Sequence, residues 1–116
     1  MKAILIDAVN RRITEVQLPE VSEGYGKVNQ AIYDLLGEGT AMMEGAARLE
    51  DNHIVYVDEE GLFNPKSGAF SFDGSHPFMG NGVVCGGNDE GGSADVKLSV
   101  DQVRQRVRFY AVRPRE

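Results

Sequence analysis

The chain contains 116 residues, of which 41% are apolar and 26% are charged, and its formal net charge is −6. This length is enough for one domain with its own core, and the composition is ordinary for a soluble globular protein. The longest apolar runs, such as Ala3–Ile6, are too short to cross a membrane, and the N-terminal segment lacks the apolar core of a secretory signal. Since a single cysteine, Cys85, allows no internal disulfide, a cytoplasmic protein without membrane contact is the simplest interpretation.

The charge is unevenly distributed along the chain. Five of the 12 basic residues are arginines within residues 104–116, and acidic residues predominate before them. An acidic body repels phosphate, which argues against nucleic acid as the partner. We therefore interpret Arg104, Arg106 and Arg108 as the solvated face of an ordered segment that pairs with nearby carboxylates. The same arginines are a candidate patch for a protein partner or, as the alternative, for nucleic acid.

The first elements in the chain are predicted to be two strands. Residues Lys2–Asp7 carry apolar side chains on both faces, which is typical of a strand inside a sheet. Residues Ile13–Leu18 also alternate, and a plausible turn at residues 10–12 separates the two segments. The pair predicts a β-hairpin that ends at Pro19, because proline cannot donate a hydrogen bond to a sheet ladder.

One clear helix is predicted over residues 27–36. Val28, Ile32 and Leu35 recur at helical spacing and form an apolar stripe. Gly37 follows at the position where many helices end in a left-handed conformation. The helix is therefore expected to cover a sheet with this stripe.

The middle of the chain is predicted to consist of short strands. Residues 41–49 and 53–57 form a second hairpin; a helix over the first of these segments is less favourable because Gly45 lowers helix propensity by about 1 kcal/mol relative to alanine. His53 opens its strand and is expected to bond to the backbone. Further extended segments are predicted at residues 61–64, 68–72 and 82–85.

The last third of the chain begins with a loop. Residues 86–94 are rich in glycine and acidic residues and are expected to be flexible. Ser99 and Gln102 fit a capping box, which predicts a short second helix near residues 100–105. Alternation then predicts a strand from about residue 106, and residues 113–116 form a short basic tail.

These elements together predict one α+β domain over residues 1–116. We expect a bent, mostly antiparallel sheet of short strands packed on the helix at residues 27–36, with the short second helix near residues 100–105. The residues predicted to form the core are Ile4, Ile6, Val28, Ile32, Leu35, Val55, Val57, Val83 and Phe109.

The reactive side chains do not complete a catalytic signature. His76 lies nine residues before Cys85, and a cysteine–histidine pair could activate a thiolate. The VVCGG context instead favours a cysteine that packs as a small apolar residue. Two separated histidines and one cysteine also lack the paired spacing of a zinc site. We therefore assign no catalytic residue, no metal ligand and no cofactor.

Two polar segments remain as candidates for ligand contact. Three consecutive carboxylates at residues 58–60 follow a strand, where such residues usually form a solvated turn. The Gly-Asn-Gly sequence at residues 80–82 precedes a predicted strand, whereas a dinucleotide fingerprint follows a strand, so it is primarily a turn signal. If a ligand binds, the candidate residues at the rim of its pocket are Asp58, Glu59, Asn64, His76 and Asn81.

Four motifs in this order carry a resemblance to a known family: MKAILID, IYDLLG, IVYVDEEGLFNP and PFMGNGVVCG. The chain resembles a family of small uncharacterised proteins encoded by bacteriophages, plasmids and related bacterial loci, which carry a domain of unknown function. The resemblance covers residues 1–87 and continues more loosely through SVDQVRQRVRF. It implies an accessory protein of a mobile element in the bacterial cytoplasm, and it supplies no activity or site residue.

Three hypotheses for the function follow. The first is a non-enzymatic protein-interaction or regulatory module whose partner is a host protein or a second copy of the chain. The alternative is a protein that binds a small, nucleotide-like ligand at the candidate rim. The third is a hydrolase or metal-dependent enzyme that uses His76 with Asp58 or Glu59.

Overall fold

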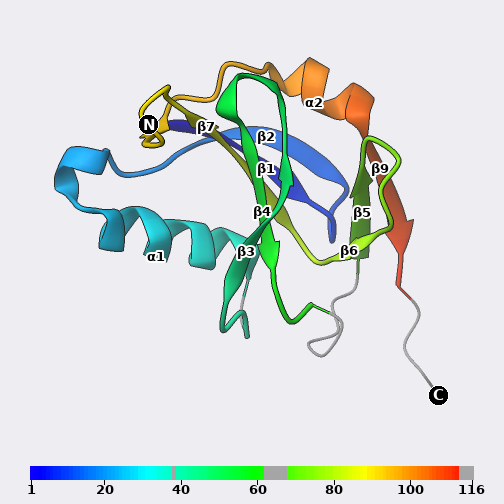
Figure 1. Cartoon of the computed structure of the whole chain (residues 1–116). Coiled ribbons are helices and arrows are strands. Elements are labelled where there is room, and N and C mark those ends of the chain that lie inside the picture. The colour runs from blue at the N-terminus through cyan, green and yellow to red at the C-terminus, as the bar shows by residue number, and fades with distance from the viewer. Residues whose placement is uncertain (38, 62–67, 113–116) are drawn as a thin grey trace.

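The computed structural model describes residues 1–37, 39–61 and 68–112, and it shows an α+β fold (Figure 1). Two helices accompany a six-stranded antiparallel sheet, here sheet A, and a three-stranded antiparallel sheet, sheet B. The predicted fold class is confirmed. The strands belong to two sheets, however, and not to one bent sheet. The predicted segment at residues 61–64, apart from Gly61, and the tail at residues 113–116 lie outside the described residues.

The bounds of most elements lie close to the predicted ones. The helices are α1 (Tyr25–Leu36) and α2 (Val100–Arg106), and two short 3-10 turns are η1 (Val21–Glu23) and η2 (Glu50–Asn52). The strands are β1 (Lys2–Asp7), β2 (Arg12–Gln17), β3 (Met43–Arg48), β4 (Ile54–Asp58), β5 (Gly68–Phe72), β6 (Phe78–Met79), β7 (Gly82–Gly87), β8 (Ser93–Ala94) and β9 (Val107–Ala111).

Sheet A has the strand order β2-β1-β7-β4-β3, and β8 pairs with the far end of β7. β1 and β2 form the predicted hairpin, in which Lys2 faces Gln17 and Asp7 faces Arg12. β1 also pairs with β7, which confirms that it is an interior strand. Both faces of the β1–β7 pair therefore need a covering layer.

Helix α1 covers one face of sheet A. Val28, Ile32 and Leu36 are buried and belong to one apolar cluster with Val83 and Cys85 of β7. The prediction that Leu35 is a core residue is wrong, because it is only partly buried and the adjacent Leu36 takes the buried position. Gly37 ends the helix with φ 111° and donates its N–H to the Tyr33 carbonyl at 3.2 Å.

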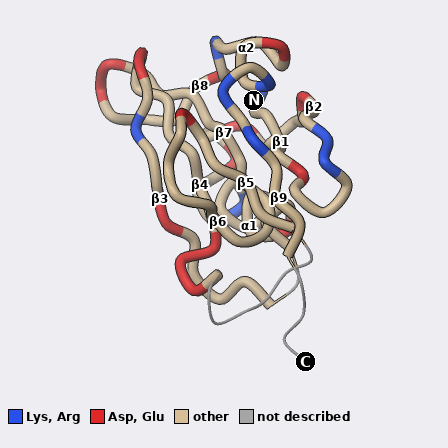
Figure 2. Tube along the Cα trace, turned by 90° about the vertical axis from the view of Figure 1, so that its right-hand side faces the viewer, with Lys and Arg blue, Asp and Glu red and all other residues tan. Residues whose placement is uncertain are grey.

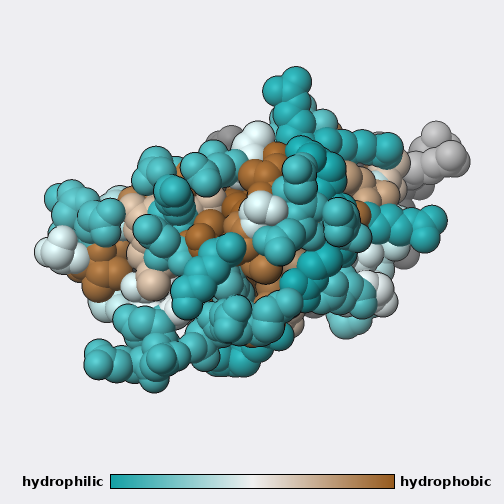
Figure 3. All heavy atoms as spheres, turned by 90° about the horizontal axis from the view of Figure 1, so that it is seen from above, coloured by the Kyte–Doolittle hydropathy of each residue, from teal (hydrophilic) through white to brown (hydrophobic). Residues whose placement is uncertain are grey.

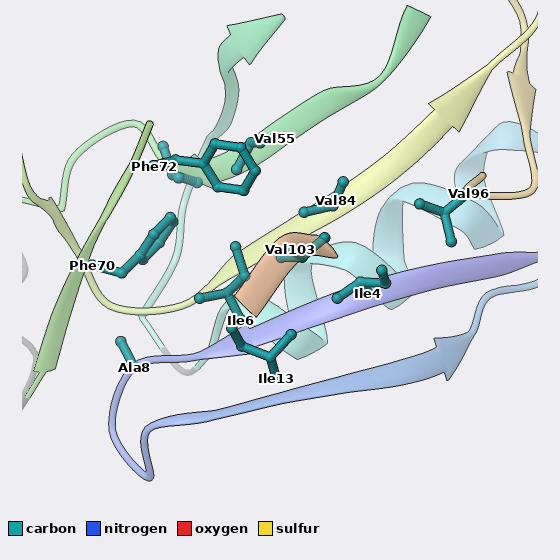
Figure 4. Close-up of a cluster of buried hydrophobic side chains, with 11 residues drawn as sticks. Ile4, Ile6, Ala8, Ile13, Val55, Phe70, Phe72, Val84, Val96 and Val103 are labelled. Atoms are coloured by element: carbon teal, nitrogen blue, oxygen red, sulfur yellow. The ribbon is translucent and has the colours of Figure 1, made fainter. Parts of the chain in front are cut away.

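Sheet B and α2 cover the opposite face of sheet A, and the second apolar cluster fills the space between them (Figure 4). β5 is buried at all five of its positions, and Val103 of α2 is fully buried. Phe109 was predicted as a core residue but is only partly buried, because β9 is the outer strand of sheet B. The labelled members of this cluster are Ile4, Ile6, Ala8, Ile13, Val55, Phe70, Phe72, Val84, Val96 and Val103.

Glycine at position 82 lets the two layers approach closely. A Cβ atom built at Gly82 would lie 2.4 Å from Cζ of Phe70, well inside contact distance. The absent side chain thus leaves room for the largest fully buried residue of the core. Residue 82 is the second glycine of the Gly-Asn-Gly sequence, and this close packing explains why a glycine stands there.

The outer surface is mainly hydrophilic. Seen from above, teal side chains cover most of the molecule, and hydrophobic residues show mainly between them near the centre (Figure 3). Within the described residues, no helix is long and apolar enough to cross a membrane.

Replacement of Ile32 by alanine tests the packing of α1. Ile32 is 3% exposed, so Ile32→Ala should lower the free energy of unfolding by about 2–5 kcal/mol through lost burial and a residual cavity. Chemical denaturation measures this change. Asn29→Ala, at an exposed position of the same helix, should change stability by less than about 0.5 kcal/mol. A loss below about 1 kcal/mol for Ile32→Ala would contradict the assigned helix face.

Candidate functional site

Asp58, the first candidate rim residue, stabilises the turn after β4 through hydrogen bonds. It is 6% exposed, and its Oδ1 accepts the backbone N–H of Glu60 at 2.9 Å. Its backbone carbonyl accepts the N–H of Gly61 at 3.1 Å, and the Thr40 hydroxyl lies 3.5 Å from its Oδ2. Glu59 is exposed in the same turn. The carboxylate of Asp58 therefore holds the backbone of this turn in place.

Asn81 connects two distant parts of the fold. Its side-chain oxygen accepts the N–H of Ala8 at 2.9 Å, and its side-chain nitrogen donates to the carbonyl of Leu35 at 3.1 Å. The first bond holds the end of β1, and the second satisfies a carbonyl in the last turn of α1. Gly80 precedes it with φ 84°, as expected of a turn glycine.

The other candidate rim residues do not form a pocket together with Asp58 and Asn81 in the described part of the chain. His76 is exposed between β5 and β6, with its ring centroid 5.6 Å from that of Phe78. Asn64 lies outside the described residues. Neither of the two hollows described below is lined by Asp58, Glu59, His76 or Asn81. The ligand rim predicted from the sequence therefore remains a prediction.

His53 is a buried structural residue at 1% exposure. Its Nδ1 lies 2.8 Å from the carbonyl of Glu50, and its Nε2 accepts the backbone N–H of Lys97 at 3.0 Å. A carbonyl partner requires a donor and an amide partner requires an acceptor, so these contacts assign the neutral tautomer with the proton on Nδ1. The predicted backbone bonding of His53 is confirmed.

Cys85 lies on β7 and belongs to the apolar cluster on the side of sheet A that α1 covers in part. The thiol is 5% exposed, and burial raises its pKa to about 12. A thiol with this pKa is almost entirely protonated at neutral pH and is a poor nucleophile. The prediction that Cys85 packs as a small apolar residue is confirmed. Within the described ranges, no three His, Cys, Asp or Glu side chains gather in a way that could hold a metal ion.

The three arginines of the predicted patch have different partners. Arg104 pairs with Asp101 on the exposed face of α2. Arg106 binds Asp73 through two hydrogen bonds of 2.8 and 2.6 Å and binds Glu50 at 2.9 Å. The predicted pairing with carboxylates is confirmed for these two arginines.

Arg108 differs from its two neighbours, because its guanidinium lies over the ring of Tyr110 at 5.6 Å and forms no ion pair within the described residues. The hydroxyl of Tyr110 lies 3.3 Å from that of Ser71 on the same outer face of sheet B. Figure 2 shows basic positions around α2 and beside β2, and acidic positions around both ends of β3. A hollow of about 450 Å³ adjoins Arg108, Tyr110 and Ser71.

A second hollow, of about 390 Å³, was not predicted from the sequence. It lies between the β3–β4 connection, the end of β7 and residues 88–93, and we call it the β7 hollow. Its glycine-rich wall is the loop that was expected to be flexible. Asn88 organises this loop, because its Oδ1 accepts the N–H groups of Glu90 at 3.0 Å and Gly92 at 2.9 Å. The flexibility of residues 86–94 stays a prediction.

Comparison with known proteins identifies one family. A family model described as "Domain of unknown function (DUF3846)" matches residues 1–109. No curated protein and no solved structure matches the chain significantly.

The thiol of Cys85 should react slowly in the folded protein. We expect labelling by a chromogenic disulfide reagent at pH 8 to be at least ~100-fold slower than in guanidinium, because burial keeps the thiol protonated and inaccessible. The folded pKa of about 12 exceeds the ordinary value of 9.0 because burial disfavours the thiolate, so the free energy of unfolding should fall as pH rises from about 9 toward 12. Rapid, complete labelling of folded protein at pH 8 would refute the buried position.

The ion pairs of Arg106 should make stability depend on pH. Arg106 lowers the pKa of Asp73 and of Glu50, chiefly through hydrogen bonds, so its stabilising effect is present above about pH 4 and is lost as pH falls through the lowered values. Arg106→Gln should cost about 1 kcal/mol at pH 7 through the partly screened pair with Asp73. Thermal denaturation should show that the difference shrinks at pH 3. Arg104→Gln, which removes an exposed pair, is the control and should have little effect at either pH.

Proposed function

The chain belongs to the DUF3846 family, whose description assigns no activity, and from its surface we propose that it is a non-enzymatic interaction module. The proposed partner is a protein that adds an extended, acidic segment to the open edge of β9. The observation that carries this proposal is the regular edge of β9 beside Arg108, which pairs with no further strand among the described residues. Strand addition of this kind is a recurrent mode of peptide recognition.

The backbone of β9 presents groups that a further strand could use. Within the described residues, β9 pairs with β5 on one side, and the register is regular from Gly68–Ala111 to Phe72–Val107. Asp73 donates its N–H to the carbonyl of Arg106 at 2.9 Å, and bonded positions alternate along an antiparallel pair. The N–H and carbonyl groups of residues 107, 109 and 111 therefore point away from β5, toward the open side.

The two edges of sheet A are less suited to strand addition. The pairing of β3 shifts between Gly45 and Ala47, and such a bulge interrupts the regular row of backbone groups. The β2 edge exposes Arg12 and Glu15, and charged side chains are a common protection of edge strands. The β9 edge instead carries arginine, phenylalanine and tyrosine at residues 108–110. Arginine and tyrosine are enriched in the energetic centres of protein interfaces.

The charge at the β9 edge supports an acidic partner. Arg106 and Arg104 are neutralised by carboxylates of this chain, whereas Arg108 is not. A carboxylate of the partner beside Arg108 would form a charge-assisted hydrogen bond there. The adjacent hollow of about 450 Å³, which Ser71 and Ser75 also line, offers space for a side chain of the added strand.

The same observations weigh against the alternatives for this patch. A nucleic acid needs several free cations to replace its counterions, and two of the three arginines are already paired. For an enzyme using His76 with Asp58 or Glu59, the carboxylate of Asp58 already binds the backbone of its own turn, which leaves the exposed Glu59 as the candidate partner. The small-ligand alternative is supported by a different part of the molecule, the β7 hollow.

We place this module in the bacterial cytoplasm as an accessory protein of a mobile element. The support for this setting is the resemblance carried by the ordered motifs, together with the free cysteine. The partner is then a host protein that presents an extended acidic segment.

Selection from a random-peptide display library tests the proposal. We expect the selected peptides to be extended and acidic, and Arg108→Glu to weaken their binding at least ~10-fold, which corresponds to about 1.4 kcal/mol. Ala111→Pro should also weaken binding, because it removes an outward N–H while proline at such an edge position leaves the fold intact. Fluorescence anisotropy measures each affinity. Arg104→Glu, an exposed arginine of α2 away from the edge, is the matched control and should bind normally.

Two results would contradict the proposal. Peptides that bind equally well to Arg108→Glu and Ala111→Pro would show that the edge of β9 is not the binding surface. Dimerisation in analytical ultracentrifugation that Ala111→Pro abolishes would show that a second copy of the chain occupies the edge.

A further inference from the structure

The β7 hollow lies on the part of sheet A that α1 leaves uncovered. Figure 1 shows α1 crossing the lower part of this face, while η2 and the loop after β7 lie toward the upper end. Ile54 and Cys85 are register partners on neighbouring strands, and Tyr56 belongs to the α1-side cluster with Cys85. The side chains of Ile54, Tyr56 and Cys85 line the floor of the hollow, next to the part of the sheet that α1 covers.

The size and walls of the hollow suit a small molecule. Its volume of about 390 Å³ falls within the usual range of ligand sites, and its walls are polar and glycine-rich above a floor that includes Ile54 and Cys85. The wall includes four glycines: a Cβ atom at Gly86 or Gly87 would lie within 2.6 Å of a backbone oxygen of Asp95 or Asn52, so these two serve close packing, whereas Gly91 faces open space.

Two of the side-chain donors that line this hollow, those of Arg48 and Tyr56, have no partner among the described residues. Within the described part of the chain, the guanidinium of Arg48 forms no ion pair or hydrogen bond, and the hydroxyl of Tyr56 forms no hydrogen bond. Desolvation raises the pKa of Tyr56, while nearby Arg48 acts in the opposite direction. The hydroxyl is therefore protonated at neutral pH and able to donate. A group that satisfies both donors must be an acceptor, and a negative charge suits Arg48 best.

Several hydrogen bonds connect the loop beside the hollow to itself and to its neighbours. Besides the two bonds to Asn88, the N–H of Ser93 donates to the hydroxyl of Tyr25 at 3.4 Å, which connects the loop to the start of α1. Asp89 also lines the hollow, and its Oδ1 lies 3.4 Å from Nδ2 of Asn52. A wall that is already shaped reduces the entropy lost when a ligand binds.

We propose that the β7 hollow binds a small molecule in which one oxyanion, a carboxylate or a phosphate, is attached to a planar ring. The oxyanion accepts hydrogen bonds from Arg48 and from the hydroxyl of Tyr56. The ring lies on the floor formed chiefly by the half-buried Ile54 and Tyr56, with the nearly buried Cys85 at its base, where it replaces water on an apolar surface. Asp89 excludes a second anionic group from the loop side and accepts from a hydroxyl or amine of the ligand. This site is separate from the β9 edge and does not depend on the interaction proposed there.

A set of four probes separates the two chemical requirements. Adenosine 5′-monophosphate and indole-3-carboxylate carry both a ring and an oxyanion, adenosine carries only the ring, and ribose 5-phosphate carries only the oxyanion. We expect one of the first two probes to bind at least ~10-fold more tightly than the fragment probes, because both parts of the site then contribute. Amide chemical-shift changes in NMR titrations should concentrate at residues 48, 54–56 and 85–93. Binding by the phosphate probe alone or by the carboxylate alone identifies the oxyanion.

Matched variants test the assigned roles. Arg48→Gln should weaken binding of the preferred probe at least ~10-fold, and Tyr56→Phe should weaken it about 3–10-fold, because they remove a charged and a neutral donor respectively. Arg12→Gln, an exposed arginine at the opposite edge of sheet A, should bind as the unchanged chain does. Amide spectra of each variant show whether it is folded.

Two outcomes would overturn the proposal. One is the absence of shift changes around the hollow with both ring-bearing anions at millimolar concentration. The other is binding that Arg48→Gln leaves unchanged while its spectrum shows a folded protein. Either result would mean that the donors in this hollow do not recognise an oxyanion.

Discussion

Apolar side chains on both faces of the β1–β7 pair are the constraint on which the rest of this structure depends. Ile4 and Val84 point to one face, and Ala3 and Val83 to the other, and all four are at most 1% exposed. Burying these faces removes apolar area from water, which is the main favourable contribution to folding. A sheet with two such faces needs two covering layers, so α1 occupies one side, and sheet B with α2 occupies the other.

The two covering layers differ in extent, and the candidate surfaces arise where they end. Helix α1 is twelve residues long and leaves uncovered the end of sheet A where β4 begins and β7 ends, so the β7 hollow stays open there (Figure 1). In the described part of the chain, sheet B has three strands in the order β6-β5-β9, which places β9 at an edge. Both surfaces thus arise because the two covering layers are smaller than sheet A. Each surface carries an arginine, Arg48 or Arg108, that forms no ion pair within the described residues.

Several polar residues that a sequence reader would examine for chemistry serve the architecture instead. Asn81 joins the end of β1 to the end of α1, and His53 joins η2 to the segment before α2. Arg106 joins the start of β9 to the β5–β6 turn and to η2. A buried polar group without a partner costs about 1–3 kcal/mol, an argument that applies most directly to His53 at 1% exposure. The chemical type of a residue does not distinguish this use from ligand binding.

The sequence by itself determined the features that depend on neighbouring residues. The apolar stripe of α1 with Gly37 behind it, the capping box of Ser99 and Gln102, and the interior position of β1 all follow from short-range patterns. Only the tertiary structure decided that β5 leaves sheet A, that Leu36 rather than Leu35 is buried, and that Arg48 and Tyr56 share one hollow. The physical reason is that these outcomes depend on how whole layers pack, through contacts between residues far apart in the chain, and local periodicity carries no record of such contacts.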